Sequence, residues 1–111
     1  MDRETFKKIV DDRLQKCQEM LTSKGNGYSR NGDVFHNFRF ASMVTGCTLE
    51  KALWGMWVKH IASVFDIIND TPDRIPEKEV LAEKIGDLIN YALLLEGMIE
   101  ERRIEQQTKN K

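Results

Sequence analysis

Two apolar segments of the chain each carry three polar side chains at the spacing i, i+4, i+7. This spacing places the three side chains of a segment along one face of a helix. Charged groups are seldom buried without partners, so two such stripes in the most hydrophobic part of a small protein predict a shared polar site between two helices. The first stripe is Lys59, Ser63 and Asp66, and the second is Glu83, Asp87 and Asn90.

The carboxylates of these stripes indicate a metal site. If the two helices pack antiparallel, Asp66 approaches Glu83 and Asp87, and converging carboxylates repel one another unless a cation neutralises them. Oxygen ligands of this kind suit Mg²⁺, which commonly bridges to substrate phosphates. Lys59 can then supply a positive charge to phosphate oxygens, and the Asn90 amide can read a base or sugar. We therefore expect a phosphate-bearing ligand, with Mg²⁺ as cofactor.

A structural interpretation of the same stripes remains open. An ion pair between Lys59 and Glu83 or Asp87 would do no more than fix the register of two helices, and such interhelical pairs are common. His60 adjoins Lys59 and points to another side of the helix. A lone histidine on an apolar helix is more often a hydrogen-bonded core residue than a ligand or an acid–base group.

Residues 22–33 form a glycine-rich segment with the residue types that turns require, and they predict a loop. Within this loop, Tyr28 offers a ring for stacking and Arg30 offers a donor for an anion. His36 and Asn37 follow, and either contact the ligand or simply hydrogen-bond the neighbouring loop. The glycines match no phosphate-binding motif, so the loop by itself does not predict a nucleotide site.

Helical periodicity extends over most of the chain. Apolar residues recur at spacings of three and four, with capping residues at the boundaries, and predict helices over residues 5–21, 33–44, 49–69 and 77–104. We therefore predict one all-α domain over residues 1–111, a small bundle of three main helices and one short helix, with a charged tail that frays from about residue 101. The helix at 49–69 is apolar nearly all round, which favours a homo-oligomer.

The composition argues against several classes of protein. The 111 residues include 17 Lys and Arg against 18 Asp and Glu, for a formal net charge of −1, and this lacks the basic excess of a general nucleic-acid binder. The two cysteines form no Cys-x-x-Cys pair and fit free thiols in a reducing compartment. No apolar signal segment or membrane span is evident. We expect a cytoplasmic protein without nucleic-acid or membrane partners.

Several short motifs together resemble small helical proteins that are widespread in bacteriophages and prophages. The resemblance covers about residues 22–99. Its outline is similar to that of phage nucleotide-modification-associated domains and, more remotely, of the all-α NTP pyrophosphatases of the MazG-like and dUTPase-like type. The motifs are KGNGYS at 24–29, DVFHNF at 33–38, ALWGM at 52–56 and EKIGDLINY at 83–91.

The resemblance implies Mg²⁺-dependent cleavage of a nucleoside triphosphate to the monophosphate and pyrophosphate, in the cytoplasm of a bacterial host if the chain is phage-encoded. The pyrophosphatases carry two glutamates three residues apart on the earlier helix, and this chain has no such pair there. Carried over by position, the metal ligands would be Asp66, Glu83 and Asp87, the phosphate contact Lys59, and the base or sugar contacts Tyr28, His36, Asn37 and Asn90.

Three hypotheses follow. The first is a nucleotide-binding protein that hydrolyses a nucleoside triphosphate. The second is a binder without turnover, which sequesters a nucleotide signal of host antiviral defence. The third is a protein–protein interaction module in which the polar stripes are structural pairs.

Overall fold

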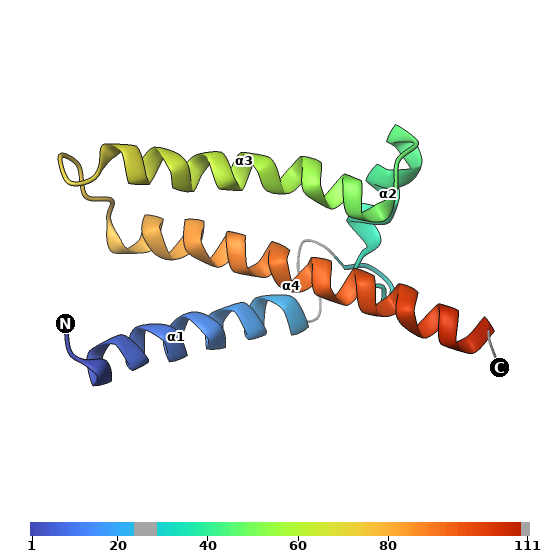
Figure 1. Cartoon of the computed structure of the whole chain (residues 1–111), viewed down its shortest axis with the longest axis horizontal. Coiled ribbons are helices and arrows are strands. Elements are labelled where there is room, and N and C mark those ends of the chain that lie inside the picture. Colours follow the sequence, from blue (N-terminus) through green and yellow to red (C-terminus); the bar gives the residue numbers. More distant parts are fainter. Residues whose placement is uncertain (24–28, 110–111) are drawn as a thin grey trace.

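The computed structural model describes residues 1–23 and 29–109, and it confirms the all-α fold (Figure 1). Within the described residues the chain forms four α-helices and no strand. Helix α4 lies between α1 and α3 and packs against both of them, whereas α1 does not pack against α3. The helices are α1 (Arg3–Thr22), α2 (His36–Thr45), α3 (Leu49–Asp70) and α4 (Lys78–Lys109).

Capping residues mark most of the helix boundaries, and α1 begins at Arg3, two residues before the predicted start. The Asp2 carboxylate accepts a hydrogen bond from the Thr5 backbone N–H at 2.8 Å, and so caps α1. Helix α2 ends at Gly46, whose φ of 69° is the left-handed conformation that favours glycine. Thr48 caps α3 by accepting from the Lys51 backbone N–H.

The start of α2 differs from the prediction that Asp33 caps a helix at residue 33. Asp33 instead closes a tight turn with Arg30, in which Asn31 and Gly32 both have positive φ. Its carboxylate accepts from the Phe35 backbone N–H at 3.0 Å and binds Arg39. The side chain is therefore committed to the turn and to Arg39, and α2 begins three residues later than predicted.

The core lies where α2, α3 and α4 meet, at one end of the molecule (Figure 1). Phe38 packs edge-to-face against Tyr91, with ring centroids 5.8 Å apart. Gly97 permits a close approach, because a Cβ at that position would lie 3.1 Å from the Phe35 ring. The buried members of the cluster are Phe35, Phe38, Leu53, Tyr91, Leu94 and Met98.

Away from this core, the apolar faces of two helices remain exposed. The face of α1 that carries Phe6, Ile9 and Leu14 is at least half exposed, and Cys17 is the residue of α1 that is buried among those described. Packing of α1 therefore uses less of its apolar face than the sequence predicts. Despite these exposed faces, none of the helices in the described part is both long enough and apolar enough to cross a membrane.

Helix α4 is longer than the predicted segment and continues to Lys109, through the tail for which we predict fraying. Two ion pairs hold its last turns against earlier helices. Arg39 of α2 binds Glu101, and Arg102 binds Glu50 of α3. Charged residues in this tail therefore connect α4 to α2 and α3.

The fully buried Met98 provides a test of the core. We expect Met98→Ala to lower the free energy of unfolding by about 2–5 kcal/mol, because the substitution leaves a cavity that the rigid neighbours cannot fill. Urea denaturation followed by circular dichroism measures this loss. Glu96→Ala, an exposed substitution on the same helix, should change stability by no more than about 0.5 kcal/mol, and equal losses would contradict this core.

Candidate functional site

A cavity of about 140 Å³ lies between α1 and α4, and we call it the α1–α4 cavity. Three of the residues predicted for the site line it, all from the second polar stripe. Residues of α1 that were not predicted for the site form its other wall. The lining residues are Arg13, Lys16, Cys17 and Met20 of α1, and Ala82, Glu83, Gly86, Asp87 and Asn90 of α4.

Cys17 of α1 and Gly86 of α4 contact each other at the wall of the cavity. The Cys17 thiol is buried and lies 3.9 Å from the Gly86 carbonyl oxygen, to which it can donate. Since Gly86 has no side chain, α1 reaches the α4 backbone there, and Arg13 lies 3.5 Å from the place that a Cβ would occupy. Burial raises the pKa of the Cys17 thiol, although the nearby Arg13 charge opposes this.

The basic side chains of the cavity form no ion pair with the described part of the chain. Within the described ranges, neither Arg13 nor Lys16 has an ion-pair partner within 4 Å. Arg13 is half-buried and Lys16 is exposed. Two positive groups therefore face Glu83 and Asp87 across a small cavity, and both remain available to an anionic ligand.

Asn90 has an unsatisfied polar group in the same cavity. The residue is 5% exposed, and its side-chain oxygen has no hydrogen-bond partner among the described residues. A buried acceptor without a donor costs free energy, and nearly all such groups in folded proteins are paired. A donor that reached the Asn90 oxygen would therefore be bound favourably.

Asp87 is linked to α3 through His60. The His60 Nδ1 atom lies 3.4 Å from an Asp87 carboxylate oxygen, and the imidazole packs 4.8 Å from the centre of the Tyr91 ring. The predicted ion pair from Lys59 to Glu83 or Asp87 does not form among the described residues, and the side chain of α3 that lies beside Asp87 is that of His60. The sequence indicated correctly that His60 belongs to the packed part of α3.

The first polar stripe lies apart from the cavity. Lys59 and Asp66 are exposed on α3, and neither lines the cavity that Glu83 and Asp87 share. In the part of the chain that the structure describes, no three His, Cys, Asp or Glu side chains are grouped so that they could hold a metal ion. The metal set of Asp66, Glu83 and Asp87 stays a prediction.

Of the residues predicted around the glycine-rich loop, those that the structure describes lie outside the α1–α4 cavity. Tyr28 falls outside the described residues. Arg30 is exposed, and its backbone N–H and C=O pair with those of Asp33. His36 and Asn37 form the first turn of α2, where His36 is half-buried and Asn37 is exposed. Their proposed contacts with a base or sugar stay predictions.

The sequence held a signal for Arg13 that our interpretation did not use. Arg13 lies three residues after Val10 and four before Cys17, so it shares a helix face with them. A charged residue on an apolar face is the pattern that identified the two stripes. The same criterion, applied to residues 5–21, would have added Arg13 to the site.

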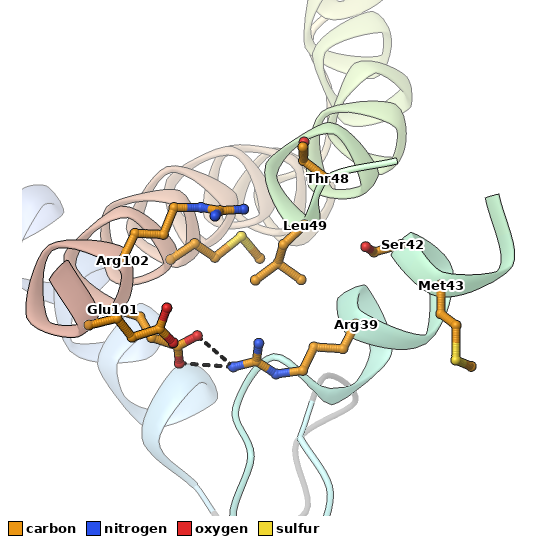
Figure 2. Close-up of a pocket in the computed structure, with 9 residues that line it drawn as sticks. Arg39, Ser42, Met43, Thr48, Leu49, Glu101 and Arg102 are labelled. Atoms are coloured by element: carbon orange, nitrogen blue, oxygen red, sulfur yellow. Dashed lines mark hydrogen bonds and ion pairs between the residues drawn. The ribbon is translucent and has the colours of Figure 1, made fainter. Parts of the chain in front are cut away.

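A second hollow of about 290 Å³, the α2–α4 groove, lies between α2, the start of α3 and the end of α4 (Figure 2). Figure 2 shows Arg39 reaching from α2 to Glu101, with both carboxylate oxygens within 2.8 Å of one guanidinium nitrogen. Leu49 points into the same hollow. Its other lining residues are Ser42, Met43, Thr48, Met98, Arg102 and Glu105.

The two arginines of this groove are already paired. Arg39 binds Asp33 at 2.7 Å as well as Glu101, and Arg102 binds Glu50 at 2.6 Å. The bonds to Arg102 lower the pKa of Glu50. At Asp33, partial burial acts to raise the pKa, but the hydrogen bonds from Arg39 and from a backbone N–H lower it overall. Because its arginines are neutralised, the groove is less suited to an anion than the α1–α4 cavity.

Comparison with known proteins neither identifies a family nor adds a ligand. The chain has no match among protein family models, curated proteins or solved structures. The resemblance to phage nucleotide-modification proteins and NTP pyrophosphatases therefore stays a prediction from the sequence motifs. The chemistry of the α1–α4 cavity is the basis for assigning a function.

The two cysteines should differ in reactivity toward a thiol reagent. We expect Cys47, which is half-buried, to react with dithionitrobenzoate at least tenfold faster than Cys17. Cys17 is 2% exposed and its pKa is raised by burial, so its reaction requires α1 to separate from α4. Cys47→Ser should remove the fast phase and Cys17→Ser the slow one. Two equally fast phases would contradict the packing of α1.

The arginine pairs of the α2–α4 groove should give a pH-dependent stability. We expect Arg39→Met to lower the free energy of unfolding by about 1 kcal/mol at pH 7, a modest loss because solvent screens a guanidinium whose side chain is 43% exposed. The pKa of Asp33 is depressed from its ordinary value of 3.8. The stabilisation that the ionised Asp33 carboxylate provides is therefore present above its ordinary pKa. This stabilisation is lost as the pH falls through the lower pKa of Asp33 in the folded state.

Urea unfolding of wild type and Arg39→Met at pH 7 and near pH 3 measures this difference. The difference between the free energies of unfolding of the two proteins should be smaller at the acidic pH. Arg103→Met is the matched control, since Arg103 pairs only locally with Glu100 on the exposed surface of α4. If the difference in the free energy of unfolding did not depend on pH, Arg39 would stabilise the protein by packing rather than by its charge.

Proposed function

We propose that this protein binds a nucleotide through the α1–α4 cavity. One observation carries the proposal: Asn90, whose buried side-chain oxygen has no hydrogen-bond partner among the described residues, lines a small cavity together with Arg13 and Lys16, two cations without an ion-pair partner within 4 Å there. A base amino group or a sugar hydroxyl is a donor for the amide oxygen, and phosphate oxygens are acceptors for a guanidinium and an ammonium. A nucleotide carries all of these groups within one small molecule.

The size of the cavity limits how such a ligand is held. Its volume of about 140 Å³ is below the roughly 300–1,000 Å³ of typical small-molecule pockets. The cavity therefore accommodates one part of a nucleotide, and the remainder extends across the rim. Lys16 and Glu83 are both exposed and form part of that rim.

Glu83 and Asp87 are suited to Mg²⁺ when phosphate is also present. Mg²⁺ is usually bound by one or two carboxylates together with substrate phosphates, and these two side chains line the same cavity. The ion would neutralise phosphate charge there. His60 would keep Asp87 in place from the α3 side, since it contacts the same carboxylate.

The proposal has a catalytic form and a non-catalytic form. In the catalytic form, the protein cleaves a nucleoside triphosphate to the monophosphate and pyrophosphate, as the resemblance implies. In the alternative form, the protein holds a nucleotide signal without turnover. Because Asp66 lies outside the cavity, two carboxylates of the predicted set remain there, and this favours binding as the common element of both forms.

We further propose that the nucleotide-binding form is a homo-oligomer. The cavity is smaller than a nucleotide, and the chain leaves apolar faces of α1 and α3 exposed. Both features are expected of a subunit that completes its fold with another copy. A protein–protein role with a different protein would use the same exposed faces.

Calorimetry against a panel of nucleotides, with and without Mg²⁺, tests the binding proposal. We expect Asn90→Leu and Lys16→Gln each to weaken binding by roughly tenfold or more, since each removes a polar contact that contributes about 1.5 kcal/mol in a partly dry site. Lys8→Gln is the control, because Lys8 is an exposed lysine of α1 that does not line the cavity. No binding across the panel, or an equal loss in the control, would contradict the proposal.

Chromatography of the same mixtures distinguishes catalysis from binding without turnover. Conversion to monophosphate that needs Mg²⁺ and disappears in Glu83→Gln and Asp87→Asn establishes the pyrophosphatase form. Recovery of the intact nucleotide after tight binding establishes the binder. In either form, both variants should retain the binding that is measured without Mg²⁺ to within about threefold, because they change carboxylates and leave Arg13 and Lys16 in place.

A further inference from the structure

The outward face of α3 carries a continuous apolar stripe that no other part of the described chain covers. Its residues have exposed fractions between 38% and 63%, which are high for large apolar side chains. This stripe is separate from the face that packs against α4, on which Leu53 and Trp57 lie in or against the core. We call it the outer α3 stripe, and it consists of Trp54, Val58, Ile61, Phe65 and Ile68.

The spacing of the outer α3 stripe is that of a helix-pairing seam. Successive members are four, three, four and three residues apart, which is the a/d pattern of a coiled coil. The seam extends over about 21 Å of helix at 1.5 Å per residue. Two small residues, Gly55 and Ala62, follow members of the stripe, and a Cβ on Gly55 would meet nothing within 4 Å. Another helix can therefore approach this face closely.

The surface area of the chain is too large for a complete fold. The accessible surface is 8631 Å² for a mass of 12.9 kDa, whereas a compact monomer of this mass exposes roughly 6,300 Å². The radius of gyration of 16.7 Å likewise exceeds the roughly 13 Å of a compact domain of this length. The excess surface is more than the roughly 800 Å² that each partner contributes to a standard stable interface.

The stripe is suited to a second copy of the same chain. No charged residue occupies any of its five positions, so the stripe can pack against itself without opposing like charges. The exposed apolar face of α1 is less suited, because Arg13 lies within it between Val10 and Cys17. A partner on that face would bury a guanidinium that has no ion-pair partner within 4 Å among the described residues.

We propose that two copies of this protein associate through the outer α3 stripe, with the two α3 helices antiparallel about a two-fold axis near Ile61. In a two-fold contact the same patch faces itself, and Ile61 is the central member of the stripe. The interface specifies the homo-oligomer of the proposed function and does not depend on the nucleotide. Binding and assembly can therefore fail independently.

The mass of the protein in solution, measured by sedimentation equilibrium without nucleotide, tests the association. We expect twice 12.9 kDa for the wild type, or a larger even multiple. Phe65→Glu should reduce the mass to that of one chain, or halve the mass of a larger assembly. The helix content measured by circular dichroism should not change, because the Phe65 side chain is 60% exposed. Leu14→Glu is the matched control on α1, at a side chain that is 51% exposed, and it should keep the wild-type mass.

Two results of this measurement would overturn the proposal. One is a wild-type mass of a single chain at all concentrations up to several hundred micromolar. The other is an assembly that survives Phe65→Glu and dissociates in Leu14→Glu, which would place the interface on α1.

Cross-linking tests the antiparallel arrangement and remains informative if Phe65→Glu does not fold. In a Cys47→Ser background, Ile61→Cys should form a disulfide-linked dimer on mild oxidation, because the two-fold axis brings this position next to its own counterpart. Trp54→Cys should not, since an antiparallel pairing separates that position from its counterpart by about 21 Å. Absence of the Ile61→Cys dimer, or equal cross-linking at both positions, would overturn the proposed geometry.

Discussion

The packing of the other helices depends on α4. Among the described helices α1 packs against α4, and α2 packs against α3. Helix α2 also reaches α4 through side chains, by the Phe38–Tyr91 ring contact and the Arg39–Glu101 ion pair. Helix α4 must therefore present different side chains to different neighbours along its length. Gly97 accepts the Phe35 ring near the core, and Gly86 accepts the Cys17 side of α1 further back. At Gly97 the absence of a side chain, rather than the presence of an apolar one, permits the contact.

The candidate site follows from this division of α4. The apolar side chains of its middle section are used by the core, whereas the section that meets α1 carries Glu83, Asp87 and Asn90. Cys17 is the buried residue of α1 among those described, and Leu21 packs against the core, so most of the apolar face of α1 adds little to this packing. A ligand that bridges Arg13 of α1 and Asn90 of α4 would add the contacts that the two helices lack. Ligand binding and docking of α1 are therefore expected to be coupled.

Much of the fold could be predicted from local patterns. The caps at Asp2 and Thr48 and the left-handed Gly46 are local backbone chemistry, and each lies where its residue type indicated. The start of α2 could not be predicted in the same way, because the Asp33 carboxylate is taken by Arg39 and by the turn. The last turns of α4 could not be predicted from local patterns either. The ion pairs from these turns to Glu50 and Arg39 join residues more than fifty positions apart.

The sequence by itself determined the all-α class, the positions of most helix ends and the polar face of α4, because helix periodicity and capping act over a few residues. The tertiary structure decided which of these polar residues share a cavity. It joined Glu83, Asp87 and Asn90 to Arg13 and Lys16, and it left Lys59 and Asp66 exposed on another face. Periodicity shows which side chains share a face, but the direction of that face depends on how whole helices pack, and long-range contacts determine that packing.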